Sequence, residues 1–180
     1  MDAWVIITVV AGVVAIAFGA ALLFRYLWLR STRRSLVALT ARMEGMRLTE
    51  SSLIEMLGAL AESPLVEWER FVTDPGCDER RALAEVRHRM DTIAHDLSSM
   101  TVPRVLCELA DEMQATAEMF SDEVALIAEA DDVSAVLLAL ERLDLNKAHG
   151  RIEALTARLN ALKQEFGVTD DAVYGGGLYI

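Results

Sequence analysis

The feature that most constrains this chain is an unbroken run of 22 residues without a charged side chain, from Ala3 to Phe24. A helix of that length is roughly 33 Å long, which matches the hydrocarbon core of a bilayer. A cleaved signal peptide would have a basic start and a shorter apolar stretch, whereas this chain begins with Met1-Asp2. The run therefore predicts a retained transmembrane anchor over residues 1–29.

Basic and aromatic residues flank this run. Four arginines follow it, namely Arg25, Arg30, Arg33 and Arg34. Basic residues beside a span stay on the cytoplasmic side, so we expect a single-pass protein of the cell membrane with its N-terminus outside and its body in the cytoplasm. Trp4 at one end of the run, and Tyr26 and Trp28 at the other, fit the aromatic belt at a membrane interface.

Small side chains recur within the span at helical spacing. They are Thr8, Ala11, Gly12, Ala15 and Gly19, separated by steps of three and four. A helix face without bulky side chains permits close helix packing, which favours a homo-oligomer. Gly and Ala are also common in membrane helices for other reasons, so both interpretations stay open.

The charge of the chain is divided into zones. The formal net charge is −11, but residues 25–47 hold six Arg and one Glu, while residues 48–180 hold eleven basic and twenty-six acidic residues. This balance excludes a basic nucleic-acid-binding protein, and we expect no nucleic-acid partner. The use of only two Lys beside abundant Arg, Ala and Val favours a GC-rich bacterial genome.

An apolar stripe follows the basic zone and predicts a juxtamembrane amphipathic helix over residues 30–62. Its members, in steps of three and four, are Leu36, Leu39, Met43, Met46, Leu53, Leu57 and Leu60. Glu50 occupies the one missed position. The stripe needs a partner, which is either the rest of this chain or its copy in a second chain as a coiled coil.

Further helices are predicted beyond Ser63-Pro64. Residues 63–77 read as a short helix, capped by Ser63, and a turn. Two stripes follow, one from Leu83 to Met100 and one from Leu106 to Ile127, the second interrupted by Thr116. A fourth helix is expected from about Val133 to Phe166, with Leu138, Leu145, Ile152, Leu159 and Phe166 at steps of seven and Gly150 as a candidate break. Asp131-Asp132 is expected to cap it, and Gly167 to end it.

No segment shows the alternation of a strand, so the predicted fold class is all-α. The transmembrane helix continues into the juxtamembrane helix, and residues 78–167 form an elongated antiparallel helical bundle or coiled coil. Residues 168–180 form a flexible C-terminal tail.

Few residues in the sequence are arranged as in a catalytic or metal-binding site. Glu85 and His88 form an ExxH pair, but the second such pair of a di-iron bundle is missing. His88, Asp91 and His95 share a face opposite the apolar stripe, where a solvated polar surface is favoured over a surface metal site. We expect no catalytic residues, no metal and no cofactor. Cys77 and Cys107 are expected to be reduced thiols, with a single bridge as the alternative for an exported body.

The last residues leave the helical pattern. Three glycines, 175–177, precede the apolar tip formed by Leu178, Tyr179 and Ile180. Such a tip is interpreted as a docking peptide or a degradation tag. A frayed tail that folds back on the bundle is the alternative.

Two hypotheses of function follow. The first is a non-enzymatic membrane-anchored scaffold or accessory subunit that oligomerises and presents an acidic bundle and an apolar tail to protein partners. The second is a signal-transmitting or gating element in which movement of the membrane helix passes into the bundle. A metal-binding accessory protein is a third alternative with less support.

Overall fold

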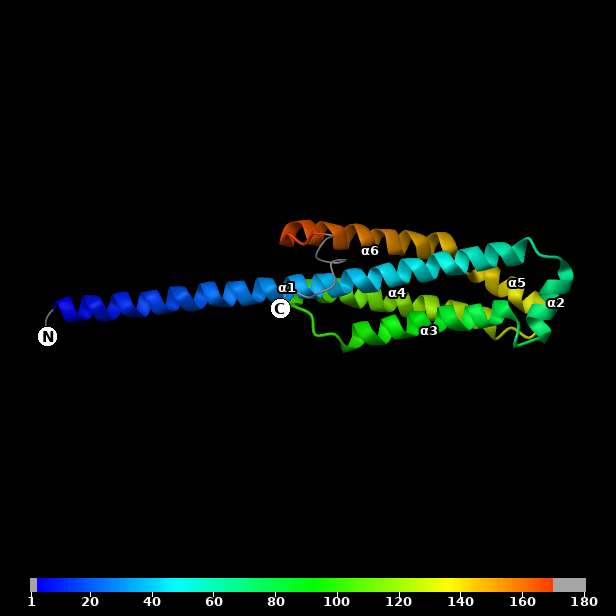
Figure 1. Ribbon diagram of the computed structural model, residues 1–180, viewed down its shortest axis with the longest axis horizontal. Coiled ribbons are helices and arrows are strands. Elements are labelled where there is room, and N and C mark those ends of the chain that lie inside the picture. Colours follow the sequence, from blue (N-terminus) through cyan, green and yellow to red (C-terminus); the bar gives the residue numbers. More distant parts are fainter. Residues whose placement is uncertain (1–2, 170–180) are drawn as a thin grey trace.

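In a computed structural model of the protein, residues 3–169 are described, and within them every regular element is a helix. The six helices of this range are α1 (Ala3–Ala61), α2 (Leu65–Thr73), α3 (Asp78–Ser99), α4 (Arg104–Ala128), α5 (Val133–Arg142) and α6 (Leu145–Phe166). The predicted all-α class is therefore confirmed. Figure 1 shows α1, α3, α4 and α6 side by side, with consecutive long helices running in opposite directions, and about half of α1 projecting beyond the others.

Helix α1 runs without interruption for 59 residues. It crosses the predicted boundary near residue 30 because no proline occurs before Pro64 and the residues on either side suit a helix. Every apolar member of the stripe from Leu36 to Leu60 is buried against the other helices of the same chain. The stripe therefore packs against the rest of its own chain, which is one of the two predicted partners; the other was a copy of the stripe in a second chain.

Helices α3 and α4 make the most extensive contact of any two helices in the bundle. The buried side chains of α3 include Leu83, Val86, Met90 and Leu97, and those of α4 include Met113 and Phe120. Their spacing of three, four and seven residues keeps one face of each helix against the other. Pro103 precedes α4 because a proline at a helix start lacks only an N–H that has no partner in the helix.

The prediction of one helix from Val133 to Phe166 is wrong. The helix is interrupted at Leu143 and Asp144. Leu143 is extended, and the Asp144 carboxylate accepts a hydrogen bond from the backbone N–H of Lys147 at 3.0 Å. Leu138 is 49% exposed, because Val136 and Leu143 are the buried residues at this point. The candidate break at Gly150 lies inside α6 and is helical.

The predicted ends of the other segments are partly correct. Asp132 caps α5 by accepting from the N–H of Ala135 at 2.7 Å, and Gly167 ends α6 with a φ of 63°. That left-handed conformation favours glycine because it has no Cβ. The predicted cap at Ser63 is wrong: its hydroxyl donates back to the carbonyl of Ala59, and Pro64 precedes α2 with no side-chain cap.

Short helix α2 covers the far end of the bundle, opposite the projecting half of α1 (Figure 1). Phe71 is buried there, and the guanidinium of Arg80 lies over its ring at 5.4 Å. Arg80 also donates to the carbonyls of Phe71 and Ala130, at 2.7 and 2.8 Å. One arginine thus joins α2, α3 and the segment after α4.

The two cysteines are both free. Cys77 precedes α3 and Cys107 lies in the first turn of α4, so the 22 residues of α3 separate them. That helix is about 33 Å long, whereas a disulfide needs Cα atoms within about 7 Å. The alternative of a bridge between Cys77 and Cys107 within one chain is therefore excluded.

Candidate interaction surfaces

The half of α1 outside the bundle, residues 3–28, is here called the arm. Over the described residues it belongs to one helix that is long and apolar enough to cross a membrane, and that apolar stretch has no buried part. Its large exposed side chains, where described, are Val13, Val14, Ile16, Phe18, Leu22, Leu23, Phe24, Tyr26, Leu27 and Trp28. An apolar surface of this extent requires a covering that residues 3–169 do not supply.

The predicted packing face on the arm is only partly described. Gly12 and Gly19 lie on the arm with no atom near where a side chain would begin. The side chains of Thr8, Ala11 and Ala15, like that of Trp4, lie outside the described side chains. Oligomerisation through this face stays a prediction.

The junction between arm and bundle holds two of the predicted flanking residues. Trp28 is 39% exposed, and its ring meets the edge of the Phe166 ring at 5.8 Å between centroids. Arg33 donates from Nε to the carbonyl of Phe166 at 2.8 Å, which satisfies one of the last carbonyls of α6. Trp28 and Arg33 thus hold the end of α6 against α1, a role that the sequence did not reveal.

The other flanking arginines are different. Arg25, Arg30 and Arg34 are exposed and make no ion pair within residues 3–169. Arg104, the first residue of α4, is also exposed without an ion pair in that range, and its neighbour Val105 is 45% exposed. Sequence reasoning missed Arg104 because it lies 70 residues beyond Arg34, and only the fold brings the start of α4 to the arm end of the bundle (Figure 1).

Glu50, the polar member of the α1 stripe, is only 4% exposed. Its carboxylate lies 3.2 Å from Nδ1 of His149, which belongs to α6 and is itself exposed. The pair lies in an open groove of about 380 Å³ that also includes Glu44, Arg47 and Glu153. A partner from another helix thus explains how an ionisable group is tolerated in the apolar stripe.

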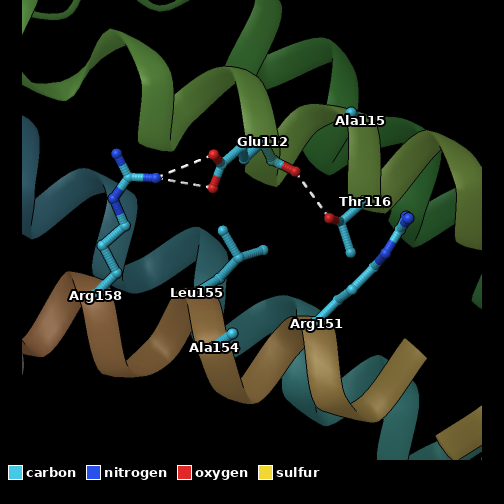
Figure 2. A pocket seen from close by; sticks show the side chains of 7 residues that line it. All are labelled: Glu112, Ala115, Thr116, Arg151, Ala154, Leu155 and Arg158. Atoms are coloured by element: carbon cyan, nitrogen blue, oxygen red, sulfur yellow. Dashed lines mark hydrogen bonds and ion pairs between the residues drawn. The ribbon is translucent and has the colours of Figure 1, made fainter. Parts of the chain in front are cut away.

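A second groove, of about 390 Å³, lies between α4 and α6 and is shown in Figure 2. Small side chains, Ala115 and Ala154, leave the space, and the arginines of α6 border it. Arg158 binds the carboxylates of Glu108 and Glu112, and these bonds raise the pKa of its guanidinium. The hydroxyl of Thr116 donates to the carbonyl of Glu112, so its polar group is satisfied within its own helix (Figure 2).

Arg151, at the other edge of this groove, has a weaker partner. Its guanidinium donates to the thioether sulfur of Met119 at 2.8 Å. Further along α4, Glu123 is half-buried and its Oε2 has no hydrogen-bond partner within residues 3–169. Burial raises the pKa of the Glu123 carboxyl, and the charges of Lys147 and Arg151 oppose that effect.

The histidines considered for metal binding lie on the outside of α3. His88, Asp91 and His95 are all exposed, and Asp91 accepts a hydrogen bond from Ser121 of α4. Within the described part of the chain, no group of three or more His, Cys, Asp or Glu side chains is arranged to hold a metal ion. Glu85 is paired with Arg89 rather than with His88.

The far end of the bundle exposes apolar side chains from two helices that contact each other. Leu65 and Val66 belong to α2, and Leu137 and Leu138 belong to α5. These four residues are here called the far-end patch. The other predicted interaction segment, Leu178, Tyr179 and Ile180, lies outside the described residues.

Comparison of the chain with known protein families, with curated proteins and with solved structures finds no significant match.

Proposed function

We propose that this protein is a non-enzymatic, single-pass membrane anchor that carries a helical scaffold in the cytoplasm. The observation that supports the proposal most is the division of α1: its first half is apolar, with the described side chains up to Trp28 exposed, while its second half lies in the core of the bundle. An exposed apolar helix of this length is stable in a bilayer because all its backbone groups are bonded within the helix. Since α1 is continuous, the bundle is held at a fixed place beside the membrane.

The surface of the bundle suits a protein partner. Residues 48–180 hold fifteen more acidic than basic residues, which keeps the body soluble and disfavours nucleic acid. The far-end patch adds apolar area at the point most distant from the arm, where a partner has free access (Figure 1). The scaffold would therefore present its far end to a subunit of a membrane complex.

Membrane insertion and topology are tested with one set of variants. Cys77 is buried and Cys107 is half-buried, so an introduced, exposed cysteine is a better reporter of topology than the native thiols. A cysteine in place of the exposed Leu126 is expected to resist an impermeant thiol reagent in intact cells and to react after lysis. Alkaline carbonate should leave the protein in the membrane pellet. Release by carbonate would contradict the anchor, and labelling in intact cells would reverse the topology.

Partner binding is tested at the far end. We expect Leu65→Ser with Leu137→Ser to remove a co-purifying protein that the wild-type protein retains after extraction in mild detergent. Leu48→Ser is the matched control, because it removes a comparably exposed leucine from α1, about 20 Å before the far end of that helix. Loss of the same protein in the control, or in neither variant, would contradict a role for the far-end patch.

A signal-transmitting element is the second candidate, and the continuity of α1 between arm and core favours it. It requires two arrangements of α1 against the other helices. Spin labels at the exposed positions Leu48 of α1 and Leu126 of α4 would then give two distance populations in bilayers. A single narrow distance distribution under all conditions would favour the scaffold.

A further inference from the structure

The arginines of this protein fall into two groups according to their partners. Most bind a carboxylate or a backbone carbonyl, as Arg42 binds Asp96 and Arg158 binds Glu108. Arg151 binds only the thioether sulfur of Met119. Within residues 3–169, the arginines that make no hydrogen bond and no ion pair, here called unpaired, are Arg25, Arg30, Arg34, Arg104 and Arg142. Arg30, Arg34 and Arg104 lie at the arm end of the bundle, Arg25 lies in the adjoining part of the arm, and only Arg142, at the end of α5, lies elsewhere.

Within residues 3–169, the acidic side chains at the arm end offset only part of this positive charge. Asp96, near the end of α3, is bound by Arg42, and Glu108, near the start of α4, is bound by Arg158. The exposed acids of the neighbouring turns without an ion pair are Asp111 and Glu165. A strongly acidic body therefore presents its one group of unpaired arginines at the end from which the apolar arm projects.

The rigid helix sets how far these arginines lie from the apolar region. Exposed apolar residues continue along α1 to Trp28, and Arg34 follows six residues later, which is about 9 Å along the helix. The headgroup layer of a bilayer leaflet is about 5–8 Å thick, and an arginine side chain extends several Å toward it. The start of α4 lies at the same end (Figure 1), so Arg104, its first residue, and the exposed Val105 belong to the turn of α4 at the arm end.

We propose that the arm end of the bundle rests on the inner leaflet and binds anionic phospholipid headgroups through Arg30, Arg34 and Arg104. The guanidinium forks bind the phosphate oxygens, and Val105 enters the interfacial region beside Arg104. This inference rests on the proposed membrane anchor. It adds that the folded body, and not only the segment next to the span, contacts lipid, which fixes the orientation of the bundle.

The test uses the full-length protein in phosphatidylcholine vesicles that contain trace spin-labelled lipids. The fraction of labelled lipid immobilised by the protein is compared for phosphatidylglycerol and phosphatidylcholine. We expect the wild-type protein to prefer phosphatidylglycerol several-fold, with a weaker preference at high salt. Arg104→Gln should lower that preference by up to about fivefold, the effect of one arginine at an anionic surface. Arg104→Lys should retain most of it.

Arg142→Gln is the matched control, because it removes the one unpaired arginine of residues 3–169 outside the arm and the arm end. Its lipid preference should equal that of the wild-type protein, and circular dichroism should show that both variants are folded. An Arg104→Gln variant with unchanged preference, beside a reduced preference in Arg30→Gln, would overturn the contact of the bundle with lipid. An equal loss in Arg142→Gln would also overturn it, because the effect would then follow net charge alone.

The same measurements give a different result if the protein is not anchored in the bilayer. A protein that does not span the bilayer would immobilise no lipid of either kind and would leave the vesicles in carbonate. Immobilised lipid without any preference for phosphatidylglycerol would keep the anchor and overturn this inference.

Discussion

At the scale of single residues, two polar side chains interrupt the apolar stripes, and the structure accommodates them differently. Thr116 is 5% exposed and bonds to the carbonyl of Glu112 four residues earlier, which a threonine in any helix can do. Glu50 has no such local solution and depends on His149 from α6. The contribution of Glu50 is therefore tied to the packing of α6 on α1.

Because of this dependence, substitutions of Glu50 and His149 are expected to have non-additive effects on the free energy of unfolding. His149→Ala is expected to lower the free energy of unfolding by about 1–2 kcal/mol, because the buried carboxylate of Glu50 loses its partner. Glu50→Leu completes the apolar stripe and should make His149→Ala nearly neutral. Urea unfolding of both single variants and the double variant measures the coupling. His88→Ala, on an exposed face, is the control and should change stability by less than about 0.5 kcal/mol. Additive effects would contradict the pair.

The carboxyl of Glu123 is expected to make the stability of the fold depend on pH. Burial raises the pKa of its carboxyl in the folded protein. Folding therefore favours the protonated form, and this contribution to stability is present below the ordinary pKa of a glutamate and is lost as pH rises through the raised value. Glu123→Gln should stabilise the protein at pH 7 by up to about 1 kcal/mol and by less at pH 4. Asp122→Asn, an exposed neighbour, should show no such difference in urea unfolding. An equal effect at both pH values would contradict this explanation.

At the scale of elements, the apolar spacing predicted the long helices correctly but not where the last one is divided. Apolar residues from Leu138 to Phe166 repeat at steps of seven, yet the first of them is exposed. Two features local to the break outweigh the repeat: Leu143 is buried in an extended conformation, and Asp144 begins a new helix. The side chains of Asp and Asn readily form hydrogen bonds to nearby backbone groups, so these residues favour the start of a helix over its interior.

The cap at Asp144 is therefore expected to carry measurable stability. Asp144→Ala should lower the free energy of unfolding by about 1 kcal/mol, because the N–H of Lys147 loses its acceptor. Asp144→Asn should retain most of that stability. Asp131→Ala, beside the cap of α5 but without a bond to it, is the control. Thermal unfolding followed by circular dichroism compares them, and a neutral Asp144→Ala would contradict the cap.

At the scale of the whole molecule, one helix, α1, forms the arm and then continues as one of the helices of the bundle. The described side chains of the arm up to Trp28 are exposed, whereas the buried core begins at Thr32 and Leu36. The core therefore does not need the arm, although Trp28 and Arg33 hold the end of α6.

A chain that begins at Arg25 is accordingly expected to stay in solution without detergent and to unfold cooperatively. Its melting temperature should lie within a few degrees of that of the full-length protein in detergent, because the core is unchanged. A second truncation that begins at Arg34, and so lacks Trp28 and Arg33, should be less stable by about 1–2 kcal/mol. Aggregation of the first chain, or equal stability of both, would contradict this division of roles.

The sequence by itself determined the all-α class, the apolar run and the faces of the long helices, because these depend on residues three or four positions apart. Tertiary structure decided which partner covers the α1 stripe, how Glu50 is paired and where α5 ends. It also decided that Arg104 joins the arginines beside the arm. These features depend on residues tens of positions apart, whose proximity arises only when the helices turn back on one another, and no local spacing records it.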